Sequence, residues 1–206
     1  MSYSGYVTLT MGEEVGRRAR KKQHTRDELV IAATRLFSER GFDETTTADI
    51  AEAADVSQRT FFRHFASKEA VLYGDSDDVA RAFGDAIRSR PKREAPLTAV
   101  ANALQELSQL AATGDPERTL LQATLAARYP SVSAYSRAVV QRGLEQAITS
   151  AVAERMGVSA TEDPRPEVIA GATMSAVRFT LRQLAVDPGR GDLLELASKA
   201  LTSLKA

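Results

Sequence analysis

The sequence contains no cysteine, so disulfide bonds, thiolate catalysis and zinc sites with sulfur ligands are excluded. The same absence fits a reducing compartment, and we expect the protein to be cytoplasmic. No apolar run approaches the ~20 residues that a membrane helix needs. Residues 1–11 lack the basic segment that opens a secretion signal. We therefore expect neither a membrane partner nor export.

Motifs of the common enzyme classes are also missing, because the sequence has no GxSxG, no P-loop and no GxGxxG. The acidic run at Asp75, Asp77 and Asp78 resembles the start of a calcium loop. However, Val79 and Ala80 stand where that loop requires a ligand and a glycine. A solvated helix face explains this run better. We expect no enzyme activity, no metal site and no cofactor.

Helical periodicity is the main structural signal in the chain. The 206 residues are enough for a small domain joined to a larger one, and 43% of them are apolar, which permits a packed core. Apolar positions recur at three- and four-residue spacing, while Val, Ile and Thr never alternate with polar residues over the length of a strand. The pattern predicts an all-α fold of about nine helices.

Charge is distributed unevenly, although 27 basic and 27 acidic residues give a net charge of zero. Residues 17–68 hold 11 Lys/Arg and 8 Asp/Glu, whereas residues 69–206 hold 16 and 17. Five of six consecutive positions are basic in the first stretch, namely Arg17, Arg18, Arg20, Lys21 and Lys22. Such a cluster suits a polyanion such as DNA, and a solvated tail is the ordinary alternative.

Capping and breaking residues divide the chain into domains and helices. We expect residues 1–23 to form a flexible basic arm, residues 24–68 a three-helix domain and residues 69–206 a larger helical domain. A capping box at Thr25 and Glu28 starts the first helix, and Gly41 ends it. Further helices are expected at about 47–54, 57–65, 67–90, 97–112, 117–128, 131–156, 167–186 and 191–204.

The two short helices, joined by a tight turn at Asp55 and Val56, form the arrangement of a helix-turn-helix. The threonine run 45–47 offers N-caps for the first of them, and Ser57 caps the second. The first helix is expected to cross the DNA backbone. The second would enter the major groove, which is just wide enough for one α-helix. Their expected core consists of Ile50, Ala51, Ala54, Val56, Phe61 and Phe65.

Polar and basic side chains of the second short helix are left to project outward. Arg pairs with guanine and Gln with adenine in the major groove. At helix ends, hydroxyl groups, ammonium groups and free amides bind phosphate. A core position for Phe62 and a packing role for His64 remain open alternatives. The candidate DNA contacts are Thr47, Ser57, Gln58, Arg59, Thr60, Phe62, Arg63, His64 and Lys68.

The stretch from Leu29 to Leu72 resembles the DNA-binding domain of TetR-family regulators, with the spacing of that family and no gap. The matching positions are Ala33, Leu36, Phe37, Gly41, Thr46, Thr47, Ile50, Ala51, Ala54, Val56, Thr60, Phe61, Phe65, Ser67, Lys68 and Leu72. The resemblance implies that phosphates are held by Thr47, Thr60, His64 and Lys68. It also implies that the groove is faced by Gln58, Arg59, Phe62 and Arg63. By analogy with other N-terminal arms, the basic arm is expected to contact phosphate or the minor groove.

Two positions depart from the pattern of the family. Members commonly have Tyr where this chain has Phe62, and many have an aromatic residue where it has Arg63. Phe62 is therefore expected to touch a thymine methyl group or a sugar, and the base preference is expected to differ. Ala48 is too short to reach a base.

The last two predicted helices, about 167–186 and 191–204, have features of a dimer interface. Gly171 and Ser175 leave a surface of small side chains on the first, and the resemblance implies that both helices pair with their copies in a four-helix bundle. A core within one chain is the alternative. The second helix has an apolar stripe of Leu193, Leu194, Ala197, Ala200, Leu201 and Leu204. A homodimer would place two recognition helices about 34 Å apart, one turn of DNA.

The resemblance further implies that the helices between about 69 and 156 enclose an apolar pocket for a small-molecule effector. Arg178 is expected to be buried there, and a buried arginine needs an anionic partner. The run 60–65 and the acidic stretch after Leu72 also resemble a subgroup proposed to bind acyl-CoA-like ligands. The predicted protein is a repressor that the effector releases from a two-fold symmetric operator; a constitutive DNA-binding protein without effector is the alternative. Candidate effector contacts are Arg128, Tyr129, Tyr135, Thr173, Arg178 and Phe179.

Overall fold

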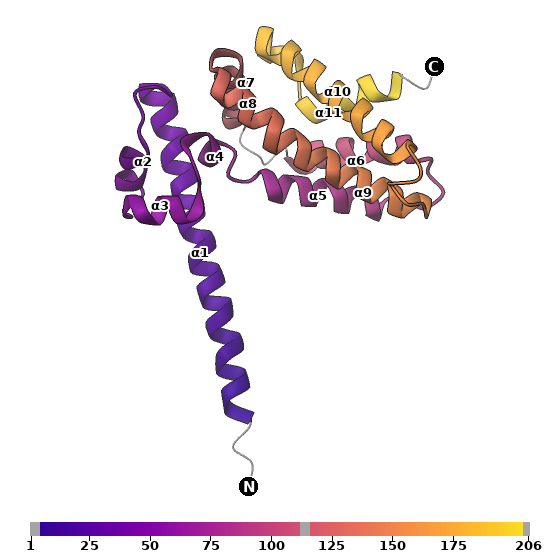
Figure 1. Ribbon diagram of the computed structural model, residues 1–206. Coiled ribbons are helices and arrows are strands. Elements are labelled where there is room, and N and C mark those ends of the chain that lie inside the picture. Colours follow the sequence, from indigo (N-terminus) through magenta and orange to yellow (C-terminus); the bar gives the residue numbers. More distant parts are fainter. Residues whose placement is uncertain (1–4, 112–115, 204–206) are drawn as a thin grey trace. The chain divides into compact units, whose positions relative to one another are not determined.

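A computed structural model describes residues 5–111 and 116–203, and all regular structure in this part of the chain is helical. The helices form two compact units, Met1–Gly74 and Asp75–Ala206 (Figure 1). The predicted all-α fold is confirmed. The predicted domain boundary after Lys68 lies a few residues earlier than the division between the units.

The first unit holds α1 (Gly5–Arg40), α2 (Thr47–Ala53), α3 (Gln58–His64) and α4 (Lys68–Leu72). Both α2 and α4 pack against α1, and α3 packs against α2. Apolar side chains at helical spacing meet between them, and burying each one fully contributes about 1.5–3 kcal/mol. The residues buried in this core include Leu29, Phe37, Phe42, Ile50, Phe61 and Val71.

α1 begins at Gly5, well before the predicted start at Thr25. The predicted capping box is wrong, because the Thr25 hydroxyl donates to the carbonyl of Lys21, one turn earlier, at 3.0 Å. No proline precedes Pro91, and Arg and Lys are good helix formers. The sequence before Thr25 therefore has no strong breaker that would interrupt α1. Residues 5–23, predicted to be a flexible arm, are helical instead. The side chains of Arg17 and Arg18 lie outside the described part of the structure.

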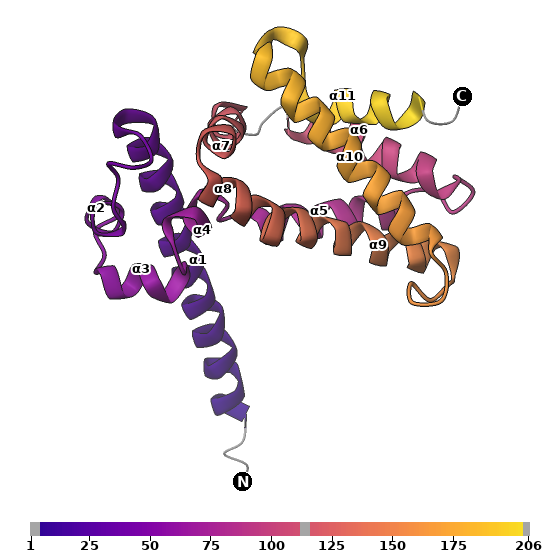
Figure 2. The ribbon, with the colours of Figure 1, turned by 45° about the horizontal axis from the view of Figure 1, so that its top comes forward.

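The second unit contains the remaining helices. Three of the α-helices and the 3₁₀ turn begin on a proline, where the missing N–H group leaves no hydrogen bond unmade. In Figure 2, α9 and α10 lie side by side, as their packing contacts require. The elements are α5 (Ser76–Ser89), α6 (Pro96–Ala111), α7 (Pro116–Arg128), α8 (Pro130–Tyr135), the π-helix η1 (Ser136–Gln141), α9 (Arg142–Met156), α10 (Arg165–Val186), the 3₁₀ turn η2 (Pro188–Arg190) and α11 (Leu193–Thr202).

The fourth predicted helix, 67–90, is in fact two helices, α4 and α5. Gly74 lies at the break, and a Cβ atom there would be only 2.4 Å from Cγ2 of Val30 and 3.1 Å from the Phe65 ring. Its carbonyl accepts a hydrogen bond from Arg26 of α1 at 3.0 Å. Long-range packing therefore breaks a helix that the local pattern continues. Likewise, the predicted helix 131–156 contains the π-helical segment η1.

The apolar stripe of α11 faces the core of its own chain. Ala197 and Leu201 are fully buried, and Leu194 and Ala200 pack against the same cluster. α6 and α10 supply the neighbours of α11 in this core. The stripe was predicted as a dimer interface, and this assignment is wrong for the buried positions. Leu204 lies outside the described residues.

Candidate nucleic-acid interface and effector site

The N-terminus of α2 is capped by residues next to it in the sequence. The Thr46 hydroxyl accepts from the amide of Asp49 at 3.1 Å, and the Asp49 carboxylate accepts from the amide of Thr46 at 2.8 Å, which completes a capping box. Hydrogen bonds from the Thr46 hydroxyl and amide hold the pKa of Asp49 below its ordinary value. Thr46 is thus the N-cap among the three predicted threonines. Thr45 instead donates to the carbonyl of Gly41 at 2.7 Å.

The turn between α2 and α3 is a left-handed C-terminal cap. Asp55 has φ 52°, and the amide of Val56 donates to the carbonyl of Ala51 at 2.9 Å. The amide of Asp55 donates to the carbonyl of Glu52 at 3.0 Å, which gives the pair of bonds of a Schellman motif. The predicted turn at Asp55 and Val56 is confirmed, and it fixes the angle between the two short helices.

α3 starts at the predicted cap, because the Ser57 hydroxyl accepts from the amide of Thr60 at 3.1 Å. Phe61 and Phe65 are buried, as predicted. Phe62 is 52% exposed, with its ring edge-on to Phe61 at 5.4 Å between centroids. The alternative of a core position for Phe62 is therefore wrong.

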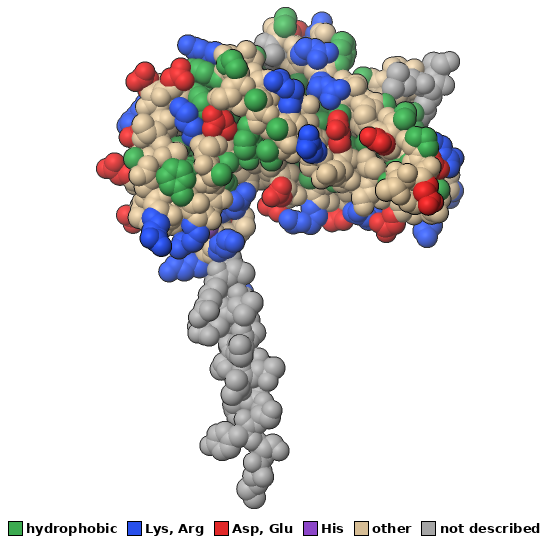
Figure 3. All heavy atoms as spheres, viewed as in Figure 1, with side chains coloured by type: hydrophobic (Ala, Val, Ile, Leu, Met, Phe, Trp, Pro, Cys, Tyr) green, Lys and Arg blue, Asp and Glu red, His purple; other side chains and the backbone are tan. Residues whose placement is uncertain are grey.

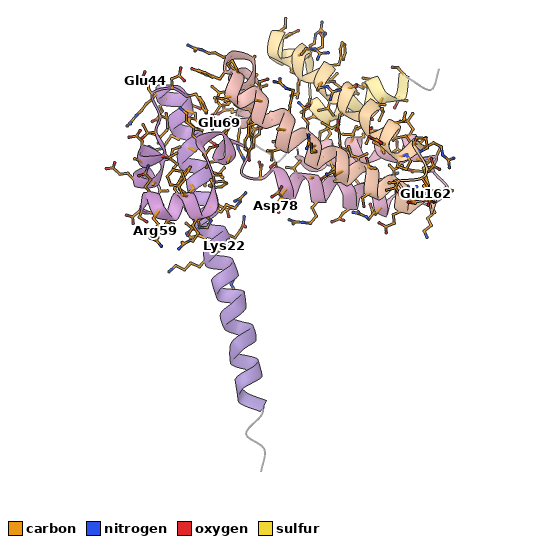
Figure 4. The ribbon with its side chains drawn as sticks, viewed as in Figure 1. Lys22, Glu44, Arg59, Glu69, Asp78 and Glu162 are labelled. Carbon is orange, nitrogen blue, oxygen red and sulfur yellow. The ribbon has the colours of Figure 1, made fainter. Side chains whose placement is uncertain are left out.

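The outer face of α3 carries Gln58, Arg59 and Arg63, all exposed. Nε2 of Gln58 donates to the hydroxyl of Thr47 at 3.0 Å, so the starts of α2 and α3 present their polar groups together. Arg59 of α3 and Lys22 of α1 extend from the same end of this unit, away from Glu44 at the other end (Figure 4). Lys and Arg side chains gather over that end in Figure 3. The arrangement is an exposed cationic surface built on a short, capped helix.

His64 lies half-buried at the end of α3, and its Nδ1 has no hydrogen-bond partner among the described residues. Burial lowers the pKa of His64 below its ordinary value, and the neighbouring cations Arg63, Lys22 and Arg26 lower it further. The imidazole is therefore neutral near pH 7. A phosphate contact by His64 would use a neutral N–H donor.

Lys68 is half-buried rather than free at the surface. Its ammonium group donates to the carbonyl of Phe42 at 2.7 Å and to that of Thr45 at 3.4 Å. It also lies 4.2 Å from the centroid of the Phe42 ring. Since an ammonium group has three N–H donors, one remains for the predicted phosphate contact. Lys68 thus ties the start of α4 to the loop before α2.

Arg26 is a structural residue of this unit that the sequence did not reveal. Its Nε and Nη2 donate to the carbonyl of Gly74 at 3.0 and 2.7 Å, and Nη1 donates to the carbonyl of His64 at 3.2 Å. The guanidinium also lies 4.3 Å from the centroid of the Phe65 ring. α1 therefore holds the end of α3 and the last residue of the unit. Its partners lie 38 and 48 positions away, beyond the reach of any local pattern.

The six predicted effector contacts have different environments. Thr173 is fully buried, and its hydroxyl donates to the carbonyl of Ile169 within α10. The Arg178 side chain is 38% exposed and 3.9 Å from Glu145, so its predicted burial is wrong. Arg128 is exposed with its guanidinium 5.4 Å from the Tyr129 ring centroid, and Phe179 is 49% exposed. Tyr129 and Tyr135 are each half-buried.

A groove of about 680 Å³ lies between α9 and α10. None of the six predicted effector residues lines it. Its lining is mainly small and polar, with two carboxylates and one guanidinium. The lining residues are Arg142, Glu145, Gln146, Thr149, Ser150, Ala153, Ala160, Glu167, Ala170 and Gly171.

Among the described residues, no helix has an apolar stretch of the length that a membrane span needs. The same residues contain no cluster of three or more His, Asp or Glu side chains arranged to hold a metal ion.

Residues 29–73 match the family described as bacterial regulatory proteins, tetR family, and residues 94–206 match the MftR C-terminal domain. The HTH-type transcriptional regulator TcmR of Streptomyces glaucescens is 34% identical over 92% of this chain and 87% of its own. The regulator MftR of Mycobacterium tuberculosis is 31% identical over 84% of this chain and 86% of its own. These relatives are named as transcriptional regulators, not as enzymes.

Two solved structures share the fold. FadR of Thermus thermophilus, a TetR-family repressor in complex with lauroyl-CoA, has a TM-score of 0.56 and 23% identity, over 87% of this chain and 93% of that one. NalD of Pseudomonas aeruginosa, the secondary repressor of the MexAB-OprM multidrug efflux pump, has a TM-score of 0.57 and 19% identity, over 89% and 95%. At these identities the likeness concerns the fold alone.

Proposed function

Because the chain belongs to the TetR family of bacterial transcriptional regulators, we propose that it is a repressor that binds a two-fold symmetric operator as a homodimer. A small-molecule effector releases it. A DNA-binding repressor acts where the DNA is, so the proposed location is the cytoplasm.

The outer face of α3 is the observation that carries this proposal. Gln58, Arg59 and Arg63 are exposed on a helix of seven residues whose start is capped by Ser57. An arginine can make two hydrogen bonds to guanine, and glutamine can do the same with adenine. These side chains read bases, whereas the groups at the helix ends, among them Thr47 and Thr60, hold phosphates.

Selection of bound duplexes from a random DNA pool tests the proposal. The expected result is a two-fold symmetric sequence with half-sites about 10 base pairs apart, one turn of DNA. An enrichment of no sequence, or of a single asymmetric site, would contradict it. The control variant Arg35→Ala is expected to select the same sequence, since Arg35 is exposed on α1 and is not one of the candidate contacts.

Exposed apolar side chains on α10 support the homodimer. Val168, Phe179 and Val186 are 66%, 49% and 86% exposed, which is unusual for large apolar residues on one helix. The outward side of α10 is therefore the proposed interface, together with the α11 positions that the core leaves uncovered. One short recognition helix buries too little surface for specific binding, so two copies are needed.

Two arginine contacts support a route from effector to operator. The Asp75 carboxylate, just before α5, accepts hydrogen bonds from Arg118 of α7 at 2.9 and 2.8 Å. Within the other unit, Arg26 holds the carbonyl of Gly74, the residue before Asp75. An effector that displaces α7 would move Asp75 and α5, and so bias the spacing of the two recognition helices. The effector must prefer one of the two spacings for any release to follow.

The proposed effector is largely apolar, and lauroyl-CoA is the first compound to test, because FadR of Thermus thermophilus was solved with it. Operator binding is measured with lauroyl-CoA, free CoA and lauric acid. Release by lauroyl-CoA alone supports an acyl-CoA effector, and release by lauric acid supports a simpler apolar ligand. If no compound in a wider apolar set changes the affinity, the alternative of a constitutive DNA-binding protein is favoured.

A further inference from the structure

The groove between α9 and α10 is open at Gly171. Ala153 and Ala170 are buried beneath it, and a Cβ atom added to Gly171 would meet no heavy atom within 4 Å. Glycine inside a helix costs about 0.5–1 kcal/mol relative to alanine, and nothing in this chain requires it at position 171. The groove is thus wide enough for a large side chain that this chain does not itself supply there.

A large exposed side chain lies two turns further along the same face of α10. Gly171, Ser175 and Phe179 are spaced four residues apart, so all three point to the same side of the helix. Phe179 is 49% exposed. Because the groove and the phenyl ring belong to one rigid helix, Phe179 cannot fill the groove of its own chain. It can fill the groove of a second copy.

We infer that two copies of α10 cross antiparallel at Ser175, so that Phe179 of each copy lies over Gly171 of the other, in the groove between α9 and α10. In a two-fold interface, when residue i contacts j, residue j also contacts i. Ser175 is the midpoint between Gly171 and Phe179, and it is exposed and small enough for close approach. The inference rests on the proposed homodimer and specifies its register.

Charges on the two sides of the contact are complementary. The groove contains Glu145 and Glu167, with Arg142 as its cation; Glu145 lies 3.9 Å from Arg178 of its own chain, so the partner's cation is expected at Glu167. Phe179 is flanked by Arg178 and Arg182, at exposed or half-exposed positions. In the antiparallel register, position 182 of one copy faces positions 167 and 168 of the other. Such pairing selects the orientation of the partner more than it adds affinity.

Phe179 supplies the apolar centre of the contact. It is 49% exposed, so covering it removes roughly half of the 150–250 Å² that a phenylalanine can bury, and the two-fold axis provides two such contacts. α10 has 22 residues, or about 33 Å at 1.5 Å per residue, so residues on both sides of Ser175 are available to extend the contact. Val168 lies on the same face and extends the apolar contact beyond Gly171.

Cysteine pairing tests the register directly, because the chain has no cysteine of its own. Ser175→Cys is expected to form a disulfide with its own copy under mild oxidation. Gly171→Cys and Phe179→Cys are expected to stay unlinked when each is alone, and to link when the two variants are mixed. The readout is a non-reducing gel, on which linked chains run at twice the mass of the 22.3 kDa chain. Ser159→Cys, at an exposed position outside α10, is the control.

Light scattering separates failure of the register from failure of the dimer. If the parent protein is a dimer but neither Ser175→Cys nor the mixed pair links, the register is overturned and the proposed function stands. If the parent protein is monomeric with and without operator DNA, both fail.

A second pair of variants avoids oxidation. Gly171→Leu fills the groove and is expected to weaken dimerisation about tenfold or more, as overpacking does. Gly143→Leu is the matched control, because Gly143 is also helical and also has open space at its Cβ position. Helical content by circular dichroism verifies folding of both. Equal dimerisation of the two variants would overturn the inference.

Discussion

On α3, neighbouring side chains have opposite surroundings, and this contrast leads to the first prediction. Phe61 is buried, whereas Arg59 and Arg63 point outward. Replacing either arginine with alanine is expected to relax base choice at one position of each half-site, with a loss of about 1–3 kcal/mol against the preferred base. Affinities for the selected operator and its single-base variants measure this. A uniform loss across all sequences would show that the arginine contacts phosphate instead.

Lys68 combines a structural contact with a predicted phosphate contact. Lys68→Ala removes the hydrogen bonds to the carbonyls of Phe42 and Thr45, and is expected to lower the free energy of unfolding by about 1–3 kcal/mol. The same variant is expected to reduce the slope of log affinity against log salt by about 1. Urea unfolding and salt titration measure the two effects. An unchanged slope would leave Lys68 with the structural role only.

His64 makes stability depend on pH. Its pKa lies below the ordinary value of about 6.5, first because of burial and then because of the nearby cations, Arg63 first among them. As the pH falls through that ordinary value, the unfolded chain takes up a proton before the folded chain does, so the free energy of unfolding falls. His64→Gln is expected to flatten this dependence between pH 7.5 and 5.5. Ser38→Ala, at an exposed position of α1 without a titratable side chain, should leave it unchanged. Two identical profiles would contradict the prediction.

Local signals predicted those residues whose partners are close in sequence. Ser57 and the turn at Asp55 were found in this way, because a cap bonds within three residues and a left-handed turn has few tolerant residue types. Arg26 was missed, since its partners are brought to it only by packing. The burial of Arg178 was predicted wrongly, because apolar neighbours in the sequence do not show which face of a helix is covered by other helices.

At the scale of elements, the turn after α2 is the most constrained point of the helix-turn-helix. Asp55 has φ 52°, a conformation that β-branched side chains rarely adopt. Asp55→Val is expected to lower the free energy of unfolding by about 1–2 kcal/mol, whereas Asp55→Asn should change it little. Glu52→Val, exposed on α2 in ordinary helical geometry, is the control. Urea unfolding of the variants measures the effect, and equal stability of Asp55→Val and Glu52→Val would contradict the prediction.

Most helices of the second unit were predicted to within a few residues, because prolines and glycines mark their ends. α7 ends at Arg128 and α10 at Val186, as expected. The differences arise where tertiary contacts override the local pattern. The break at Gly74 follows from its packing on Val30, and the inward stripe of α11 follows from its contacts with α6 and α10. Neither of these packing contacts can be predicted from the periodicity of the sequence alone.

At the scale of the whole molecule, the proposed function depends on a second copy of the chain and on a small-molecule effector. The sequence predicted the class of fold and the exposed face of α3, and the stretch that resembles the family covers about a quarter of the chain. The effector contacts stay a prediction, since pocket residues have no fixed spacing in the sequence. The outward face of α10 now assigns Phe179 to the proposed interface rather than to the effector.

The spacing of half-sites is the most direct measure of the central claim, that two recognition helices bind as one rigid pair. Five extra base pairs between the half-sites of the selected operator turn the second one to the opposite side of the duplex. The expected outcome is a loss of affinity to the non-specific level, about 10³-fold or more. Undiminished binding to the lengthened operator would mean that each chain binds DNA alone.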